Sequence, residues 1–284
     1  MSPRAEISPI TRIIERIDQI GEGIDPPLQI ETGFPTLTKL VGGGLRRGDL
    51  VVIGGDVGAG TSALALAIAL RAAAARQPTL FVSGEMSIDR VHERALAMTA
   101  RIPLDTIRQA SCTPEERALL AATALSLRDL PFAVTLVGHG GAPDVIRLAA
   151  GRTGTALLVV DGLASLVAST SAQPLAEEQA RAIVSLKRLA IELDLCVVVT
   201  AKLPGLDRQR SDRRPRLGDF GALRSVEEHA DVVLGLYREE VYGRDLGIAG
   251  ATELGILKQR DGTLTYLDLY FFGPLLRYED MVDR

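Results

Sequence analysis

The chain has 284 residues, 46% of them hydrophobic, which is enough to bury one large core or two small ones. Its 32 basic and 36 acidic residues give a net charge of -4, so any site for a polyanion has to be local. No apolar stretch reaches the roughly 20 residues of a membrane span, no signal-peptide pattern is present, and the two cysteines indicate neither a disulfide nor a metal site. We therefore expect a cytoplasmic protein.

The first residues predict an amphipathic helix. Isoleucines recur at helical spacing from Ile10 to Ile20, with charged and polar residues between them. Glycines and prolines in the segment 21–27 end this pattern. We predict a linker helix and linker over 1–27, tethered to one domain over 28–284. The apolar face of the helix has to pack on its own domain or on a neighbouring subunit.

From about residue 28, short β-rich stretches alternate with helical patterns, which is typical of a mainly parallel sheet with crossover helices. The predicted strands are 50–54, 79–83, 132–137, 156–160, 195–200 and 231–236. Two later stretches, 253–258 and 265–271, flank Asp261-Gly262 and predict a terminal antiparallel hairpin. The expected fold class is α/β, with helices flanking the sheet.

The sequence Gly55-Asp-Val-Gly-Ala-Gly-Thr-Ser62 joins the first predicted strand to an apolar helix. It matches the phosphate-binding pattern G-x-x-x-x-G-K-[ST], except that Thr61 stands at the lysine position. In such a loop the glycines, here Gly55, Gly58 and Gly60, let backbone amides surround the phosphates. The hydroxyl of Ser62 would bind magnesium. Without the lysine, a plain tight turn accounts for the same residues.

Two carboxylates follow other predicted strands. Asp161 ends the apolar stretch Leu157-Leu-Val-Val-Asp161, where an acid can hold magnesium through water. Glu85 comes just after strand 79–83 and could polarise an attacking water, although a carboxylate favoured by a helix N-terminus explains it equally well. Because the carboxyl ends of parallel strands meet at one edge, these residues and the glycine-rich loop should converge on one crevice.

Several motifs follow one another in a recognisable order. They are Thr32–Leu40 with Gly43–Leu50, Gly84-Glu-Met-Ser87, Val159-Val-Asp161, Ala230–Arg238 and Lys258-Gln-Arg-Asp-Gly262. Together they resemble the motor domain of the DnaB-type replicative helicases, which belong to the RecA-like ATPases. The resemblance runs from about residue 8 to residue 280, and only the family's N-terminal domain has no counterpart. It implies that residues 28–284 form a RecA-like ATPase domain.

The resemblance implies a ring hexamer that binds ATP and Mg²⁺ between subunits and moves along single-stranded DNA in replication. By this similarity Gly55–Ser62 would hold the triphosphate and Asp161 would serve the magnesium. Glu85 would activate water, and Arg94 would stack on the adenine.

The family also implies contacts between neighbouring subunits. Lys258 and Arg260 would reach the γ-phosphate bound to the next subunit, as an arginine finger does. The isoleucine face of residues 10–20 would dock on that neighbour. Such a head-to-tail contact closes into a ring if the rotation allows.

Two departures concern catalysis. Thr61 replaces the lysine that would neutralise γ-phosphate charge, so we expect slow or absent hydrolysis. After strand 195–200, where the family usually has a glutamine that senses the γ-phosphate, this chain has Lys202. Lys202 either points into the crevice and partly replaces the missing lysine, or is a solvated loop residue.

The residues that would contact DNA also differ from the family. Its Arg-Glu-Ser-Gly run aligns with Gly221-Ala-Leu-Arg224, so that Arg224 is displaced by three positions. The loop 168–174 has no basic residue and would bind backbone phosphates weakly. Arginines within 207–216, among them Arg213 and Arg214, either line a DNA channel or belong to a solvated loop.

These observations leave two main functions. The first is an ATP-driven DnaB-like helicase or single-strand translocase, with Lys202 or an altered geometry covering for Thr61. The second is a degenerate paralogue that serves as a regulatory subunit, in a homo-hexamer or in a mixed ring with an active helicase. Lys258 and Arg260 could then complete an active neighbour's site. A RecA-like regulator unrelated to DNA is a third alternative.

Overall fold

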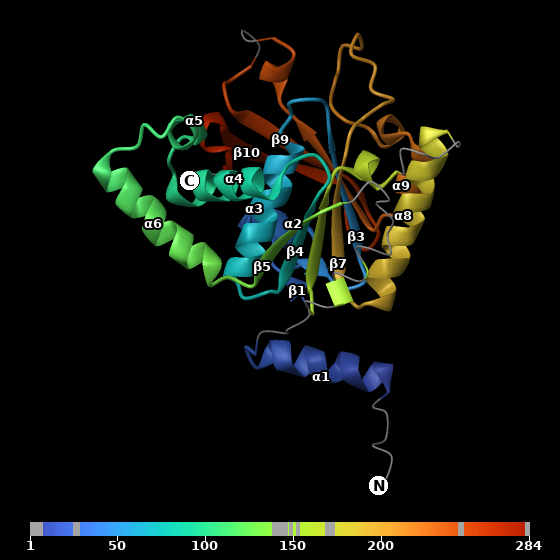
Figure 1. Ribbon diagram of the computed structural model, residues 1–284. Helices are drawn as coiled ribbons and strands as arrows, with labels where there is room; N and C mark the ends of the chain where they lie inside the picture. The colour runs from blue at the N-terminus through green and yellow to red at the C-terminus, as the bar shows by residue number, and fades with distance from the viewer. Residues whose placement is uncertain are drawn as a thin grey trace.

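The computed structural model describes residues 8–24, 29–137, 147, 150–151, 154–167, 174–243 and 247–281. Its centre is a nine-stranded sheet with the order β11-β10-β9-β8-β3-β7-β6-β4-β5 (Figure 1). The strands are β3 Leu50–Gly55, β4 Thr79–Ser83, β5 Phe132–Leu136, β6 Leu157–Asp161, β7 Cys196–Ala201, β8 Val232–Tyr237, β9 Ala251–Gln259, β10 Thr265–Phe272 and β11 Arg277–Asp280. A separate two-stranded sheet pairs β1 Gln29–Ile30 with β2 Leu45–Arg46.

The strand order confirms the predicted α/β class. The six strands from β3 to β8 pair in parallel and agree with their predicted ranges to within one residue at each end. The predicted terminal hairpin is confirmed as β9 and β10, and β9 also pairs antiparallel with β8. The sequence pattern missed β11, because its four residues alternate charged side chains with the buried Tyr278 and carry no apolar signal.

Helices cover both faces of the parallel part of the sheet (Figure 1). The main helices are α1 Pro9–Gly21, α2 Pro35–Leu40, α3 Thr61–Ala74, α4 Ile88–Ala100, α5 Leu104–Arg108, α6 Pro114–Arg128, α8 Leu175–Glu192 and α9 Ser225–His229.

Successive residues of a strand point to opposite faces of the sheet. Accordingly Val51 of β3 packs in the cluster that contains α3 and α4, whereas Val52 packs in the cluster that contains α8. Burial on both faces explains why these strands are continuously apolar.

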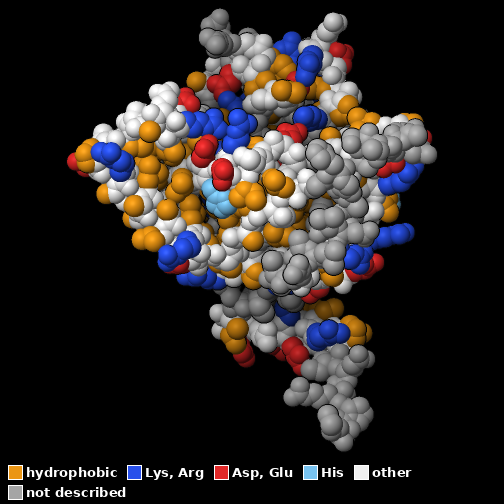
Figure 2. Space-filling model, viewed as in Figure 1, with side chains coloured by type: hydrophobic (Ala, Val, Ile, Leu, Met, Phe, Trp, Pro, Cys, Tyr) orange, Lys and Arg blue, Asp and Glu red, His pale blue; other side chains and the backbone are white. Residues whose placement is uncertain are grey.

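Helix α1 lies apart from the sheet (Figure 1), and none of its residues is buried. Apolar, basic and acidic side chains of this helix all reach its surface (Figure 2). Ile10 is 72% exposed and Ile17 58% exposed, so the apolar face has no cover within the described part of this chain. Among the helices in the described ranges, none is long and apolar enough to cross a membrane.

One buried carboxylate joins the amino ends of the central strands. Asp231, which is 5% exposed, precedes β8. It accepts hydrogen bonds from the Leu50 amide at 2.8 Å, the Lys187 ammonium at 2.6 Å and the Arg260 guanidinium at 2.8 Å. A buried charge is costly unless it is paired and hydrogen-bonded, and Asp231 meets both conditions.

We expect Asp231→Ala to lower the free energy of unfolding by about 3 kcal/mol, because it leaves the buried Leu50 amide without its acceptor and the Lys187 ammonium without a carboxylate partner. Urea denaturation followed by circular dichroism measures this change. The matched control is Asp129→Ala, which breaks an exposed ion pair with Arg128 and should cost less than about 0.5 kcal/mol. Equal losses in the two variants would show that the Asp231 cluster does not stabilise the sheet.

Candidate functional site

The glycine-rich loop keeps the shape of a strand-to-helix turn despite the missing lysine. It leaves β3 at Gly55 and enters α3 at Thr61. Gly58 and Gly60 have φ values of 85° and 98°, which side chains with a Cβ rarely adopt. A Cβ on Gly60 would also lie 2.3 Å from the Tyr278 hydroxyl. Both glycines are therefore required by the backbone itself.

Two distant side chains support this loop from the C-terminal part of the sheet. The fully buried Tyr278 of β11 donates a hydrogen bond to the Ala59 carbonyl at 2.9 Å. Arg238, just after β8, donates to the Gly58 carbonyl at 3.3 Å and forms an ion pair with Glu240. Sequence patterns did not indicate Tyr278, whereas Arg238 ends one of the motifs that carry the resemblance.

A third support comes from the arginine-rich segment 207–216. Arg208 donates to both carboxylate oxygens of Asp56 within the loop, at 3.0 Å and 2.7 Å. Hydrogen bonding by Arg208 holds the pKa of the Asp56 carboxyl below its usual range. One arginine of this segment therefore braces the phosphate loop, a role that its composition alone did not reveal.

A cavity of about 210 Å³ lies beside the loop at the carboxyl ends of β3, β6 and β7. Its polar lining includes Thr61, Ser62, Glu85, Thr200 and Lys202. Of the residues that the sequence placed in one crevice, Thr61, Ser62 and Glu85 line this cavity, and Asp161 is hydrogen-bonded to the lining residue Thr200.

Lys202 and Glu85 face each other in this cavity. The Lys202 ammonium lies 3.2 Å from Glu85 Oε1, although 66% of the lysine side chain is exposed. Lys202 thus lines the cavity and is at the same time largely exposed to solvent, so its role toward a phosphate stays a prediction. The ion pair brings a positive charge to the carboxylate that could activate water.

Asp161 lies at the end of β6 and is almost fully buried. Its Oδ1 accepts a hydrogen bond from the Thr200 hydroxyl at 2.9 Å, whereas its buried Oδ2 has no hydrogen-bond partner among the described residues. Burial raises the pKa of the Asp161 carboxyl, although the nearby hydroxyls of Ser62 and Thr200 act in the opposite direction. An unpaired carboxylate oxygen near a serine hydroxyl fits Mg²⁺, which commonly uses one or two protein carboxylates plus phosphate oxygens. The described residues contain no group of three or more His, Cys, Asp or Glu side chains that could hold a metal ion. A magnesium ion at Asp161 would therefore need phosphate oxygens as further ligands.

Arg94 extends from α4 toward the same carboxylate. It is half-buried, its Nε has no hydrogen-bond partner within the described ranges, and its positive charge acts on Asp161. Its stacking on an adenine stays a prediction. A separate hollow of about 530 Å³ adjoins Arg238 and is lined by the aromatic residues Tyr270, Phe271 and Phe272. The sequence did not indicate this hollow.

Lys258 and Arg260 lie at the opposite end of the sheet from the cavity. Val233 of β8 pairs with Lys258 of β9, near the amino end of β8. Because β8 runs parallel to β3, that end is remote from the phosphate loop. The Lys258 ammonium donates to the Glu227 carbonyl at 2.5 Å, and 54% of the Arg260 side chain is exposed. Neither residue belongs to the cavity of its own chain.

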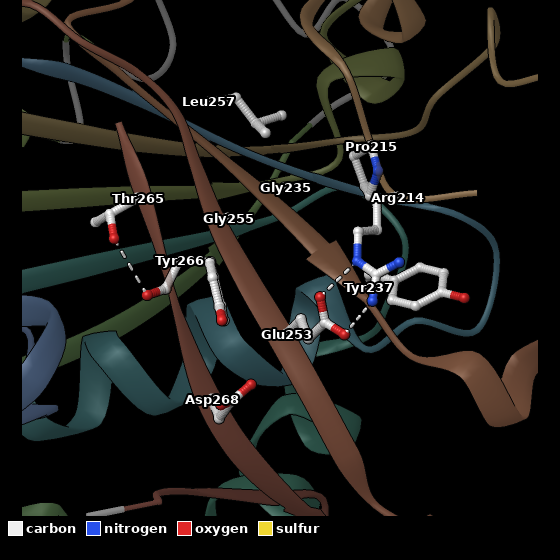
Figure 3. Close-up of a pocket in the computed structure, with 10 residues that line it drawn as sticks. All are labelled: Arg214, Pro215, Gly235, Tyr237, Glu253, Gly255, Leu257, Thr265, Tyr266 and Asp268. Carbon is white, nitrogen blue, oxygen red and sulfur yellow. Dashed lines mark hydrogen bonds and ion pairs between the residues drawn. The ribbon is translucent and has the colours of Figure 1, made fainter. Parts of the chain in front are cut away.

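The arginines considered for DNA all have partners within the chain. Arg214 makes two 2.6 Å hydrogen bonds to Glu253 beside the Tyr237 ring, at the edge of a hollow of about 630 Å³ (Figure 3). Arg213 donates to the Arg208 carbonyl at 2.8 Å and packs on the Tyr242 ring.

Arg224 forms an ion pair with Glu227 at 2.9 Å and is 77% exposed. DNA contacts by Arg213, Arg214 and Arg224 stay predictions that require these pairs to open. Residues 168–173 of the loop after Asp161 lie outside the described residues.

Solved structures match this architecture. The chain superposes with a TM-score of 0.85 on a structure described as an ATPase domain, at 21% identity, covering 98% of this chain and 100% of the other. It gives the same TM-score with a DnaB-like replicative helicase solved in a study of its interactions with primase, at 20% identity, covering 98% and 68%. These matches show that the chain shares the α/β fold of these two structures.

The sequence comparison narrows this class to a family. The family model described as "DnaB-like helicase C terminal domain" matches residues 29–280, so the chain belongs to that family. It is 30% identical over 257 residues to the replicative DNA helicase DnaB of Leifsonia xyli subsp. xyli, covering 89% of this chain. It is 28% identical over 284 residues to that of Pasteurella multocida, covering 97% of this chain. The chain spans 56% and 61% of the length of these two relatives.

The raised pKa of Asp161 gives a stability prediction. Burial destabilises the folded state above the folded pKa, and this penalty disappears below the unfolded value of 3.8. Without nucleotide, we expect Asp161→Asn to melt at a higher temperature than the native chain at about pH 7, with a gain that shrinks toward about pH 4. Calorimetry over this range measures the difference.

The control for this measurement is Asp231→Asn, at the other end of the sheet. Asp231 has three hydrogen-bond donors around its carboxylate, so this variant should lose stability at neutral pH. A lower melting temperature for Asp161→Asn at neutral pH would contradict the prediction.

Proposed function

We propose that residues 28–284 form the motor domain of a DnaB-like replicative helicase, preceded by a linker over 1–27. The domain binds ATP with Mg²⁺ and couples hydrolysis to movement along single-stranded DNA. The observation that carries this proposal is that Ser62 and Glu85 line one cavity beside the glycine-rich loop, while Asp161 is hydrogen-bonded to Thr200 of the same lining. The curated relatives are named replicative DNA helicases, which supports the same activity.

The residues in and beside the cavity have separate roles in the proposed reaction. The loop Gly55–Ser62 would hold the β- and γ-phosphates, and Ser62 and Asp161 would hold Mg²⁺, which would neutralise negative charge on the phosphates. Glu85 accepts a proton from water as its oxygen bonds to the γ-phosphorus, and the bond from that phosphorus to the β,γ-bridging oxygen breaks. ADP and phosphate leave, and the proton returns to solvent from Glu85.

The cavity and the pair Lys258 and Arg260 lie at opposite ends of the sheet, which supports a site shared between two subunits. Arg260 and Lys258 cannot serve their own cavity, because β9 carries them to the other end of the sheet. In a head-to-tail ring, they would meet the cavity of the neighbour. The exposed isoleucines of α1 also need an apolar partner, which a second subunit supplies.

Thr61 favours a second candidate function, that of a catalytically weak ring subunit. A threonine cannot stabilise negative charge on the γ-phosphate, so turnover by this chain should be slow. Such a subunit would still lend Arg260 and Lys258 to an active neighbour in a mixed ring. DNA binding should be weak and salt-sensitive, because the candidate arginines are paired with carboxylates or carbonyls.

Steady-state ATP hydrolysis with Mg²⁺, with and without single-stranded DNA, tests the proposal. We expect slow turnover by the native chain and at least a roughly tenfold increase in Thr61→Lys, because a charge on the γ-phosphate returns. Adding Glu85→Gln to Thr61→Lys should abolish that turnover, since the amide cannot accept the proton. Unchanged hydrolysis in the double variant would exclude Glu85 as the base.

Complementation tests the shared site. In a Thr61→Lys background, Glu85→Gln and Arg260→Ala should each be inactive alone. Mixed together, they should regain activity, because random mixing gives about one quarter of interfaces with both groups intact. Arg260 also pairs with Asp231, so the melting temperature of Arg260→Ala has to be recorded alongside. A mixture that stays inactive, although both variants are folded and assembled together, would contradict the shared site.

A further inference from the structure

The charge of the cavity depends on a single lysine. Thr61 adds no charge where the phosphate-loop pattern has a lysine. Among the described residues that line the cavity, Lys202 is the only cation and Glu85 the only anion. A triphosphate carries several negative charges that need a positive partner. The chain therefore offers one candidate for this partner within the described lining.

The fold holds the backbone before Lys202 close to the phosphate loop. Gly54 of β3 pairs in register with Ala201 of β7, so Lys202 follows directly beside the start of the loop. The Thr200 hydroxyl accepts a hydrogen bond from the Gly162 amide at 2.8 Å and donates one to Asp161 Oδ1 at 2.9 Å. The end of β7 is thus tied to the end of β6, and Lys202 extends from a fixed point.

We infer that Lys202 replaces the missing phosphate-loop lysine by binding the γ-phosphate of ATP, and that Glu85 is its partner only while that phosphate is absent. This inference rests on the proposed function, because it assigns a residue to the same nucleotide site. It explains how a loop with Thr61 keeps a positive charge available for the triphosphate.

The exposure of the pair makes such an exchange of partners feasible. The side chain of Lys202 is 66% exposed and that of Glu85 is 43% exposed. An exposed ion pair contributes little to stability, so the ammonium can leave Glu85 at small cost. When the γ-phosphate takes the ammonium, Glu85 becomes free to accept a proton from water. Binding of ATP, but not of ADP, would then release the base.

Arg94 is the rival source of positive charge. It acts on Asp161 from α4 and does not belong to the cavity lining. The guanidinium of Arg94 therefore already has the buried Asp161 carboxyl as a neighbour outside the cavity lining. Its position supports the magnesium end of the site and leaves the γ-phosphate to Lys202.

Calorimetric titration with Mg²⁺ and either ADP or the non-hydrolysable analogue AMPPNP tests this inference without requiring turnover. We expect Lys202→Ala to weaken AMPPNP binding by about ten- to a hundredfold, the range for one lost charge-assisted contact, and to change ADP binding less than about threefold. Lys202→Arg should keep most of the affinity for AMPPNP, because it keeps the charge. Thr61→Lys should restore AMPPNP binding in the Lys202→Ala background.

Two control variants isolate the role of the charge. Lys39→Ala removes one lysine from the exposed surface of α2 and should change neither affinity. Arg94→Ala should weaken both nucleotides alike, because it acts through Asp161. A selective loss of AMPPNP in Arg94→Ala, with none in Lys202→Ala, would overturn the inference in favour of Arg94.

The remaining outcomes separate the inference from the proposed function. If the native chain binds AMPPNP and Lys202→Ala binds it equally well, the inference fails and the nucleotide site stands. If the native chain binds neither nucleotide while Thr61→Lys binds both, Lys202 does not replace the lysine and the second candidate function applies. If neither protein binds a nucleotide, the proposed function itself fails.

Discussion

The direction of β3 relative to its neighbours is the constraint on which the rest of the structure depends. Because β3 runs parallel to β7 and β8, the strand ends that carry the phosphate loop and Lys202 meet at one edge. The parallel strands β6 and β4 bring Asp161 and Glu85 to the same edge. The reversal at β9 then sends Arg260 to the other edge, where it is remote from the cavity. The site that we propose to be shared between neighbouring subunits is therefore a consequence of strand direction.

Two buried aspartates at opposite edges show how the same residue type serves different purposes. Asp231 has three hydrogen-bond donors around its carboxylate and stabilises the amino edge of the sheet. Asp161 is also buried, yet its Oδ2 has no hydrogen-bond partner in the described part of the chain and its pKa is raised. Unsatisfied buried acceptors are costly, and they persist mainly where a ligand can complete them. This difference is our reason for proposing Asp161 as a magnesium-binding position and Asp231 as a structural contact.

The phosphate loop is held by residues from three distant parts of the chain. Tyr278 of β11, Arg238 after β8 and Arg208 of the arginine-rich segment each bond to the loop backbone or to Asp56. These three supports do not involve the side chain at position 61. None of these three contacts requires a lysine at position 61, so the loop keeps the geometry of a strand-to-helix turn with Thr61 in place.

Local sequence patterns were sufficient to predict the class of fold, the order of the strands along the chain and the residues at their carboxyl ends. Buried parallel strands need continuous apolar residues, and a glycine-rich turn before a helix is readable at short range. The sequence could not show that Lys202 pairs with Glu85, that Arg208 braces the loop or that Arg213 and Arg214 are paired within the chain. Those contacts join segments that are far apart in sequence or belong to irregular loops, and their formation depends on side-chain positions that no local pattern encodes. That the Lys202 side chain lines the cavity follows only from the fold, because the parallel register of β3 and β7 brings it beside the loop.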